Sequence, residues 1–223
     1  MITAPLPSVL FAFGLGGVTL LAAKLLLAFV TRREPAERGA YLPPAGGVAL
    51  VVAVAAAVLL LLWNRPLTAV SAVQACWAAA LAVIFTVDLR VRYILDVWTA
   101  PLALLAVLAA VVLPHPAYPS LLSVLGGGAI GLVVFAAFYG LGLLLFRQPA
   151  LGLGDVKLAV LMGLMVGAEN ILTAVFIGAF LGGLASVVLV ALRRAALGDA
   201  PAYGTYLTLG GYAALLGAAG LWH

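Results

Sequence analysis

The chain has 223 residues, of which 66% are hydrophobic and 8% are charged, and its formal net charge at pH 7 is +4. A soluble domain carries about 25% charged residues, so this composition excludes a soluble globular protein and indicates an integral membrane protein. The positive charge does not predict nucleic-acid binding, because the basic residues lie in short connections between apolar segments.

Apolar runs of about 18 residues or more are long enough to cross a bilayer as helices. A shorter run, 156–168, is predicted to be either a short eighth span or a re-entrant segment. We therefore expect an all-α fold, a polytopic membrane helix bundle of about eight transmembrane segments. Two units are expected, an N-terminal two-span segment at 1–66 and a core at 67–223. The long runs are 8–31, 46–63, 67–87, 97–114, 120–146, 171–192 and 204–222.

The basic residues fall in alternate connections when eight spans are counted. This positive-inside pattern places those connections in the cytoplasm and both termini outside. No basic residue precedes the first apolar run, so residues 1–31 are not predicted to be a cleavable signal peptide. The residues that carry the pattern are Arg32, Arg33, Arg38, Arg90, Arg92, Arg147, Lys157, Arg193 and Arg194, against Arg65 in the other connections.

Several residues with reactive or charged side chains have simple explanations. Lys24 lies near the cytoplasmic end of the first run, so its ammonium group is expected to reach the lipid headgroups. His115 and His223 are predicted to lie outside, with no partner at metal-ligand spacing. Cys76 is the only cysteine, which excludes an intramolecular disulfide and a cysteine-based zinc site. The sequence predicts no metal and no other cofactor.

Small and aromatic residues in the spans are expected to serve packing. Gly127 and Gly131, and likewise Gly178 and Gly182, have the four-residue spacing that lets membrane helices approach closely. Trp77 lies in the middle of a span and is predicted to pack inside the bundle. Tryptophans near span ends, which fit an aromatic belt at the membrane interface, are Trp63, Trp98 and Trp222.

Three aspartates lie where predicted spans meet the cytoplasmic face: Asp88, Asp96 and Asp155. Asp96 and Asp155 precede helical segments, where a carboxylate caps free N–H groups. Asp88 could instead pair with Arg92, four residues further along. However, Asp88 stands at a helix C-terminus, which is the unfavourable end of the helix dipole for an anion. Structural roles therefore explain Asp96 well and Asp88 poorly.

Gly152 and Gly154 come just before Asp155. Glycines at such positions let the backbone bend or let a substrate strand approach closely. Two carboxylates that converge in a cleft at the membrane face would share a proton. The ionised one would activate water and the protonated one would polarise a peptide carbonyl. Asp88 and Asp155 are therefore candidates for a catalytic pair of the aspartic-protease type.

The stretch GLGDVKLAVLMGLMVG (152–167) closely resembles the G-x-G-D-x-K-L motif of bacterial prepilin peptidases, the type IV leader peptidase family of GxGD aspartic proteases. DLRVRYILDVWT (88–99) is similar to the family's D-x-R-x-x-x-I-P-D/N-x-x-T motif. APAYGTYLTLGG (200–211) is loosely similar to its P-x-x-P-F-G-P-x-L-x-x-G-G element. The resemblance covers roughly residues 70–215.

The resemblance implies that the catalytic pair corresponds to Asp88 and Asp155. It implies that Gly152, Gly154 and Lys157 support the motif or bind substrate. Lys157 has no derived role beyond its charge near the site. Asp96, which matches an acidic or amide position of the family, is interpreted as structural.

The chain departs from the family pattern at several positions. Leu95 stands where the family has proline. Ala202, Tyr203 and Thr205 replace proline, phenylalanine and proline in the third element. The paired cysteines that large bifunctional members carry, and that are linked to N-methylation of the mature pilin, have no counterpart. The resemblance therefore implies proteolysis but does not predict methylation.

The resemblance thus implies a multi-pass protein of the bacterial inner membrane. Its activity would be that of an aspartic endopeptidase, which removes the basic leader of type IV prepilin-like precursors at the cytoplasmic face. The expected partners are prepilin or pseudopilin precursors and membrane lipid, with no nucleic acid, and the oligomeric state stays open.

Two other functions remain open from the sequence. ERGAYLPPAGGVAL (37–50) loosely resembles a loop of magnesium-dependent polyprenyl-phosphate sugar-1-phosphate transferases, although this chain lacks their adjacent aspartates. A non-enzymatic transporter or assembly subunit is the second alternative.

Overall fold

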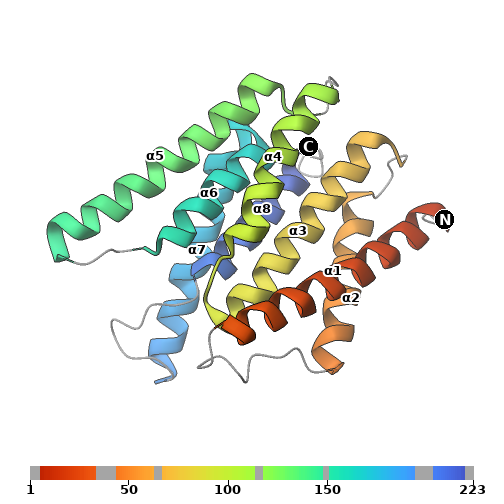
Figure 1. The fold of residues 1–223 in the computed structure, drawn as a ribbon. Helices are drawn as coiled ribbons and strands as arrows, with labels where there is room; N and C mark the ends of the chain where they lie inside the picture. Colours follow the sequence, from red (N-terminus) through yellow and green to blue (C-terminus); the bar gives the residue numbers. More distant parts are fainter. Residues whose placement is uncertain are drawn as a thin grey trace.

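The computed structural model describes residues 6–33, 44–62, 67–113, 118–147, 151–193 and 203–218, which form eight α-helices and no strand (Figure 1). Each predicted apolar run overlaps one helix, and the short run overlaps a helix of its own. The predicted all-α fold is therefore confirmed. The helices are α1 Leu6–Arg33, α2 Pro44–Leu61, α3 Ala69–Val91, α4 Asp96–Val112, α5 Leu121–Phe146, α6 Leu153–Val166, α7 Ala168–Ala191 and α8 Tyr203–Ala218.

Four stretches of helix within the described residues are long and apolar enough to cross a membrane: Leu10–Phe29, Ala69–Val91, Leu121–Leu145 and Ala168–Ala191. The chain is therefore a helical membrane bundle. By contrast, α6 has 14 residues. At about 1.5 Å per residue it is about 21 Å long, which is less than the hydrocarbon core of about 30 Å. A count of eight spans thus remains a prediction.

Helix α6 lies inside the bundle, packed against α4, α5, α7 and α8. Most of its residues are buried, including every residue from Leu161 to Val166. Helix α3 is the second central element and packs against α1, α2 and α8. Figure 1 shows α5 and α6 on one side of the molecule and α1 and α2 on the other. Helix α8 contacts both α3 and α6, so it joins the two halves.

Glycines allow the helices of this bundle to approach closely. A Cβ atom at Gly127 or Gly131 of α5 would overlap the backbone of α6. At Gly178 of α7, an added Cβ would lie 2.9 Å from the Cα of Leu207, and Gly182 faces the same helix, α8. The predicted packing role of both glycine pairs is confirmed. Through these contacts α5 and α7 hold α6 and α8 in place.

The ends of α3 are defined by local hydrogen bonds. At its start, the backbone N–H of Thr68 donates to Ser71 Oγ at 2.8 Å and the N–H of Ser71 donates to Thr68 Oγ1 at 3.3 Å, a capping box. At its end, Arg92 adopts a left-handed conformation with φ 51° and donates its N–H to the carbonyl of Asp88. Helix α4 begins at Asp96. Asp88 and Asp96 therefore lie at the same end of the bundle.

The structure also shows where several other residues lie for which the sequence predicted a position or a role. Trp77 is buried and its Nε1 donates to Tyr118 Oη at 3.1 Å, so its predicted packing role is confirmed. Trp98 is half-buried and packs against buried side chains. Cys76 of α3 is exposed, as is Lys24 of α1. Predictions that lie outside the described residues concern Arg38, Trp63, Arg65, His115, Arg194, Trp222 and His223.

Candidate active site

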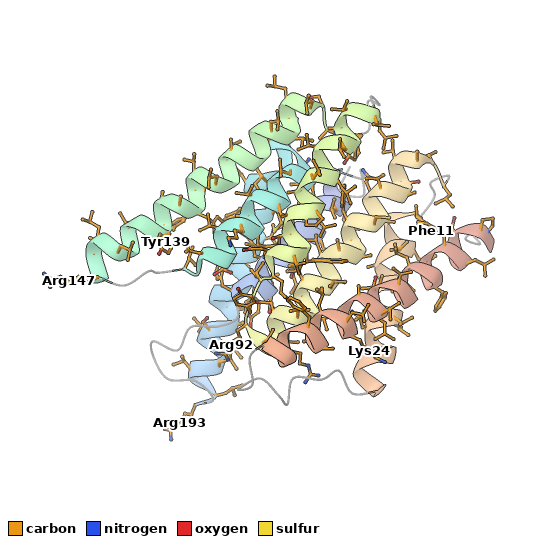
Figure 2. All side chains as sticks on the ribbon, in the orientation of Figure 1. Phe11, Lys24, Arg92, Tyr139, Arg147 and Arg193 are labelled. Atoms are coloured by element: carbon orange, nitrogen blue, oxygen red, sulfur yellow. The ribbon has the colours of Figure 1, made fainter. Side chains whose placement is uncertain are left out.

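One end of the bundle brings together the termini of four helices: the C-terminus of α3 and the N-termini of α4, α6 and α8. The three aspartates lie on these termini. Arg92 and Arg147 are the C-cap residues of α3 and α5, and Arg193 follows the C-terminus of α7; Figure 2 shows Arg92 and Arg193 in the lower part of the view and Arg147 at its far left. The candidate site therefore lies at the basic end of the molecule.

Asp88 lies in the last turn of α3 and is only 4% exposed. Its Oδ2 accepts a hydrogen bond of 2.8 Å from the hydroxyl of Thr205, and the backbone N–H of Thr205 also donates to this carboxylate. Gly204 lies against it, because an added Cβ there would be 2.9 Å from Oδ2. Asp88 therefore contacts the first turn of α8, where free N–H groups favour an anion.

This contact explains why a carboxylate is found at the C-terminus of α3. The dipole of α3 disfavours a negative charge at that position, but the N-terminus of α8 favours one. The ion pair between Asp88 and Arg92 that the sequence offered as an alternative is not formed, although both residues are described. Arg92 instead gives Asp88 a backbone hydrogen bond and a nearby positive charge.

Asp155 lies in the first turn of α6, and its Oδ2 accepts the backbone N–H of Gly152 at 3.1 Å. The predicted capping by Asp155 is thus confirmed. Gly152 has an ordinary extended backbone, with φ −73° and ψ 149°, so no bend requires glycine there. At Gly154, an added Cβ would lie 3.2 Å from the Cβ of Ile94. This second glycine therefore lets α6 pack closely against the connection between α3 and α4.

Asp88 and Asp155 are close enough to interact electrostatically. Burial raises the pKa of Asp155 to about 6, the N–H of Gly152 lowers it, and the negative charge of Asp88 raises it. Burial also raises the pKa of Tyr203, and the charge of Asp155 adds to this effect. Ile94 packs against both Gly154, which precedes Asp155, and Gly204, which lies against Asp88, so the two aspartates are at the same end of the bundle, near the N-terminus of α8. Two interacting carboxylates of this kind titrate as a pair.

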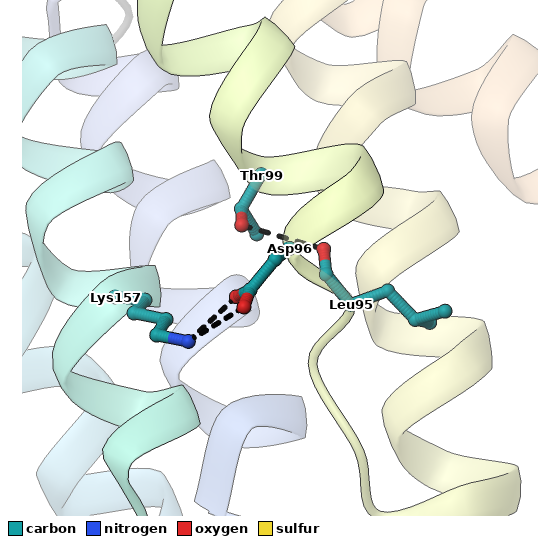
Figure 3. A network of polar contacts seen from close by, with 4 residues as sticks. All are labelled: Leu95, Asp96, Thr99 and Lys157. Carbon is teal, nitrogen blue, oxygen red and sulfur yellow. Dashed lines mark hydrogen bonds and ion pairs between the residues drawn. The ribbon is translucent and has the colours of Figure 1, made fainter.

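Asp96 does not join this pair. Its carboxylate accepts two hydrogen bonds from Lys157 Nζ, at 2.7 and 2.8 Å, which link α4 to α6 (Figure 3). Asp96 lies in the first turn of α4, where its charge suits the helix dipole as predicted, but the N-cap residue is Leu95 and no side-chain cap hydrogen bond forms. Its carboxylate is directed at the lysine instead. The side chains of Lys157 and Asp96 are 51% and 64% exposed, and such pairs contribute about 0 to 1 kcal/mol.

An apolar cavity of about 470 Å³ lies beside the site, between α2, α3 and α8. Leu89 and Arg90 line one end of it, directly after Asp88 in the sequence. Thr208 also lines it, one turn along α8 from Thr205. Neither Asp88 nor Asp155 lines the cavity. Within the described ranges, no group of three His, Cys, Asp or Glu side chains is placed to hold a metal ion.

Sequence reasoning missed the part that α8 plays in the site. Thr205 and Tyr203 were noted only as departures from a motif, and Gly204 was not singled out. The available signal was the position of a Gly-Thr pair at the start of an apolar helix. A hydroxyl and free N–H groups at such a start are suited to bind a carboxylate.

The region of the chain that matches a known protein family includes both Asp88 and Asp155. The family model described as "Type IV leader peptidase family" matches residues 75–187, about half of the chain. The chain is 30% identical over 90 residues to a "Prepilin leader peptidase/N-methyltransferase" of Pseudomonas putida, covering 40% of this chain and 31% of that protein. It is 26% identical over 99 residues to a protein of the same description from Stutzerimonas stutzeri, covering 44% and 34%.

The chain therefore spans about a third of the length of these curated relatives. No solved structure matches it. The family match ends before α8, so it includes Asp88 and Asp155 but not Gly204 or Thr205.

Proposed function

The chain belongs to the type IV leader peptidase family, and we propose that it is a membrane aspartic endopeptidase that removes the basic leader from type IV prepilin-like or pseudopilin-like precursors. The observation that supports this proposal is that Asp88 contacts the first turn of α8 and that Ile94 packs against both this turn, at Gly204, and Gly154 beside Asp155. Two carboxylates that interact at one end of a bundle this apolar need a chemical reason, and a shared proton supplies one.

The surroundings of the two carboxylates favour different roles. Asp88 accepts two hydrogen bonds from Thr205, and hydrogen bonds of this kind stabilise a carboxylate as the anion. Asp155, whose pKa is raised to about 6, holds a proton more readily than an ordinary aspartic acid. In this proposal Asp88 takes a proton from the attacking water, while Asp155 donates to the carbonyl oxygen of the scissile peptide bond. As the C–N bond breaks, Asp88 passes the proton taken from water to the leaving amine, and Asp155 takes back its proton from a hydroxyl group of the tetrahedral intermediate.

The placement in the membrane follows the distribution of basic residues. Arg92 ends α3 just after Asp88, Arg147 ends α5 just before the helix that holds Asp155, and the positive-inside rule assigns that end of the bundle to the cytoplasm. We place both termini outside and treat 67–223 as the catalytic core, to which 1–66 adds two spans. A precursor would then hold its apolar helix in the bilayer while its basic leader meets the dyad from the cytoplasm.

Family membership favours proteolysis over the two other functions that the sequence left open. A sugar-phosphate transferase would use its aspartates to hold Mg²⁺ against a phosphate. A transporter or assembly subunit would need neither carboxylate for chemistry. Each alternative therefore makes a prediction about metal dependence or about the aspartates that differs from that of a protease.

The direct experiment is cleavage of a candidate prepilin by the purified protein in liposomes, with EDTA or with Mg²⁺. We expect leader removal at the same rate in both, because a pair of carboxylates activates water without a metal. Mass spectrometry should show a mature pilin with a free amino terminus. Activity that is lost in EDTA and returns with Mg²⁺ would favour the transferase-like geometry. A product heavier by one methyl group, formed only with a methyl donor, would contradict activity limited to proteolysis.

A further inference from the structure

The contact between Asp88 and Thr205 is a buried polar interaction between distant parts of the chain. Both residues are 4% exposed, they are 117 positions apart, and the hydroxyl oxygen lies 2.8 Å from Asp88 Oδ2. A buried carboxylate is costly unless hydrogen bonds compensate for its lost hydration. Thr205 supplies two such bonds, one from its hydroxyl and one from its backbone N–H.

Thr205 is itself held in place. The hydroxyl of Thr208 donates to the carbonyl of Thr205 at 2.7 Å, and both threonines are buried in the first two turns of α8. The missing side chain of Gly204 leaves the space that the carboxylate occupies. The donor is therefore fixed before any substrate arrives.

The two carboxylates have unequal sets of partners. Asp88 has the two donors of Thr205 and the positive charge of Arg92, whereas Asp155 has one donor, the N–H of Gly152. Since an anion is stabilised by the larger number of donors, the negative charge is favoured on Asp88 and the shared proton on Asp155.

Few other charged or titratable groups face Asp88 from the surrounding helices. Asp155 of α6 carries a like charge, and Tyr203 of α8 lies beside Asp155. On α1, Lys24 is exposed, and the sequence of α2 contains no charged residue. Burial disfavours a charge on both carboxylates, and Thr205 and Arg92 are the groups that oppose this effect at Asp88.

We propose that Thr205 is a positioning residue that fixes Asp88 as the ionised member of the pair through its side-chain hydroxyl. This inference rests on the proposed protease function and adds to it the means by which the two aspartates acquire different roles. Thr205 touches neither water nor substrate in this proposal and acts only through Asp88.

The test compares Thr205→Val, which removes the hydroxyl but keeps the shape, with Thr205→Ser, which keeps the hydroxyl. For Thr205→Val we expect the acid limb of the pH dependence of kcat to move to higher pH by about one pH unit or more, because a charge-assisted hydrogen bond is lost. The KM for the prepilin should be unchanged, and Thr205→Ser should behave like the wild type. Thr86→Val is the matched control, because it removes a buried hydroxyl of α3 whose hydrogen bond goes to the carbonyl of Ala82 rather than to Asp88 or Thr205.

A second measurement is independent of cleavage. Infrared difference spectra of wild type against Asp88→Asn, recorded across pH in liposomes, follow the carboxylate band of Asp88. In Thr205→Val, the pH at which this band is half developed should be higher by the same amount. Thr205→Ala provides a second variant if the valine impairs folding. A shifted band in a protein that cleaves no prepilin would disprove the protease function while supporting the positioning role. An unchanged midpoint and profile in Thr205→Val, or an equal change in Thr205→Ser, would overturn the positioning role.

Discussion

Replacing Asp88 or Asp155 with asparagine is expected to lower the rate of leader cleavage by about a thousandfold or more, because general acid and base catalysis each contribute about 10²- to 10⁴-fold. The amide keeps the shape of the carboxyl group but can neither take a proton from water nor share one with its partner. Asp88→Asn additionally loses the acceptor for the donors of Thr205. The measurement is the initial rate of prepilin cleavage in liposomes at matched protein levels.

Asp96→Asn is the control for this experiment. It removes a third aspartate at the same end of the bundle, but its carboxylate is exposed and bound to Lys157 rather than to the pair. Because an exposed ion pair contributes little, we expect activity within a few-fold of the wild type. Wild-type cleavage by either Asp88→Asn or Asp155→Asn would show that the two carboxylates are not a catalytic pair.

Replacing Gly204 with alanine is expected to cost about a hundredfold in kcat, the effect of displacing a catalytic group by about 1 Å. The added Cβ would lie 2.9 Å from Oδ2 and 3.0 Å from Cγ of Asp88, and 3.1 Å from Cδ1 of Ile94. These distances are too short for an ordinary contact, so the carboxylate must move away from the first turn of α8. The measurement is kcat for prepilin cleavage, alongside the thermal stability of the variant.

Gly183→Ala is the matched control, since an added Cβ there meets nothing within 4 Å. It lies in α7, the helix that packs along α8, and should leave the rate unchanged. If Gly204→Ala cleaves within twofold of the wild type, the contact between Asp88 and α8 is not needed for catalysis. If it fails to fold, the glycine serves packing rather than placement of the carboxylate.

The eight helices were predictable because each is encoded by an apolar run, and hydrophobicity over such lengths leaves little alternative to a helix in a membrane. The number of membrane spans could not be predicted in the same way. Helix α6 is apolar because it is buried among four other helices, and hydropathy does not distinguish burial in protein from exposure to lipid. Only the packing shows that this short helix is surrounded.

Two motifs predict that Asp88 and Asp155 form a pair, which stays a prediction, but the hydrogen-bond partners of Asp88 and Asp96 could not be predicted. A local rule assigned Asp96 to a helix cap, whereas a lysine 61 positions away binds its carboxylate. Thr205, 117 positions from Asp88, was noted only for departing from a motif. Contacts between residues this distant depend on helix packing, which no local pattern in a single sequence contains.

The most direct test of a proton-sharing pair is the pH dependence of kcat for prepilin cleavage in liposomes containing EDTA. Because the pKa of Asp155 is raised to about 6, the pair should lose its shared proton above that pH, and the rate should fall by about tenfold per pH unit. At lower pH the rate should fall again, as the second carboxylate gains a proton. We predict a bell-shaped profile with its alkaline limb near pH 6. A rate that stays constant or rises from pH 6 to about pH 9 would contradict catalysis by a shared proton.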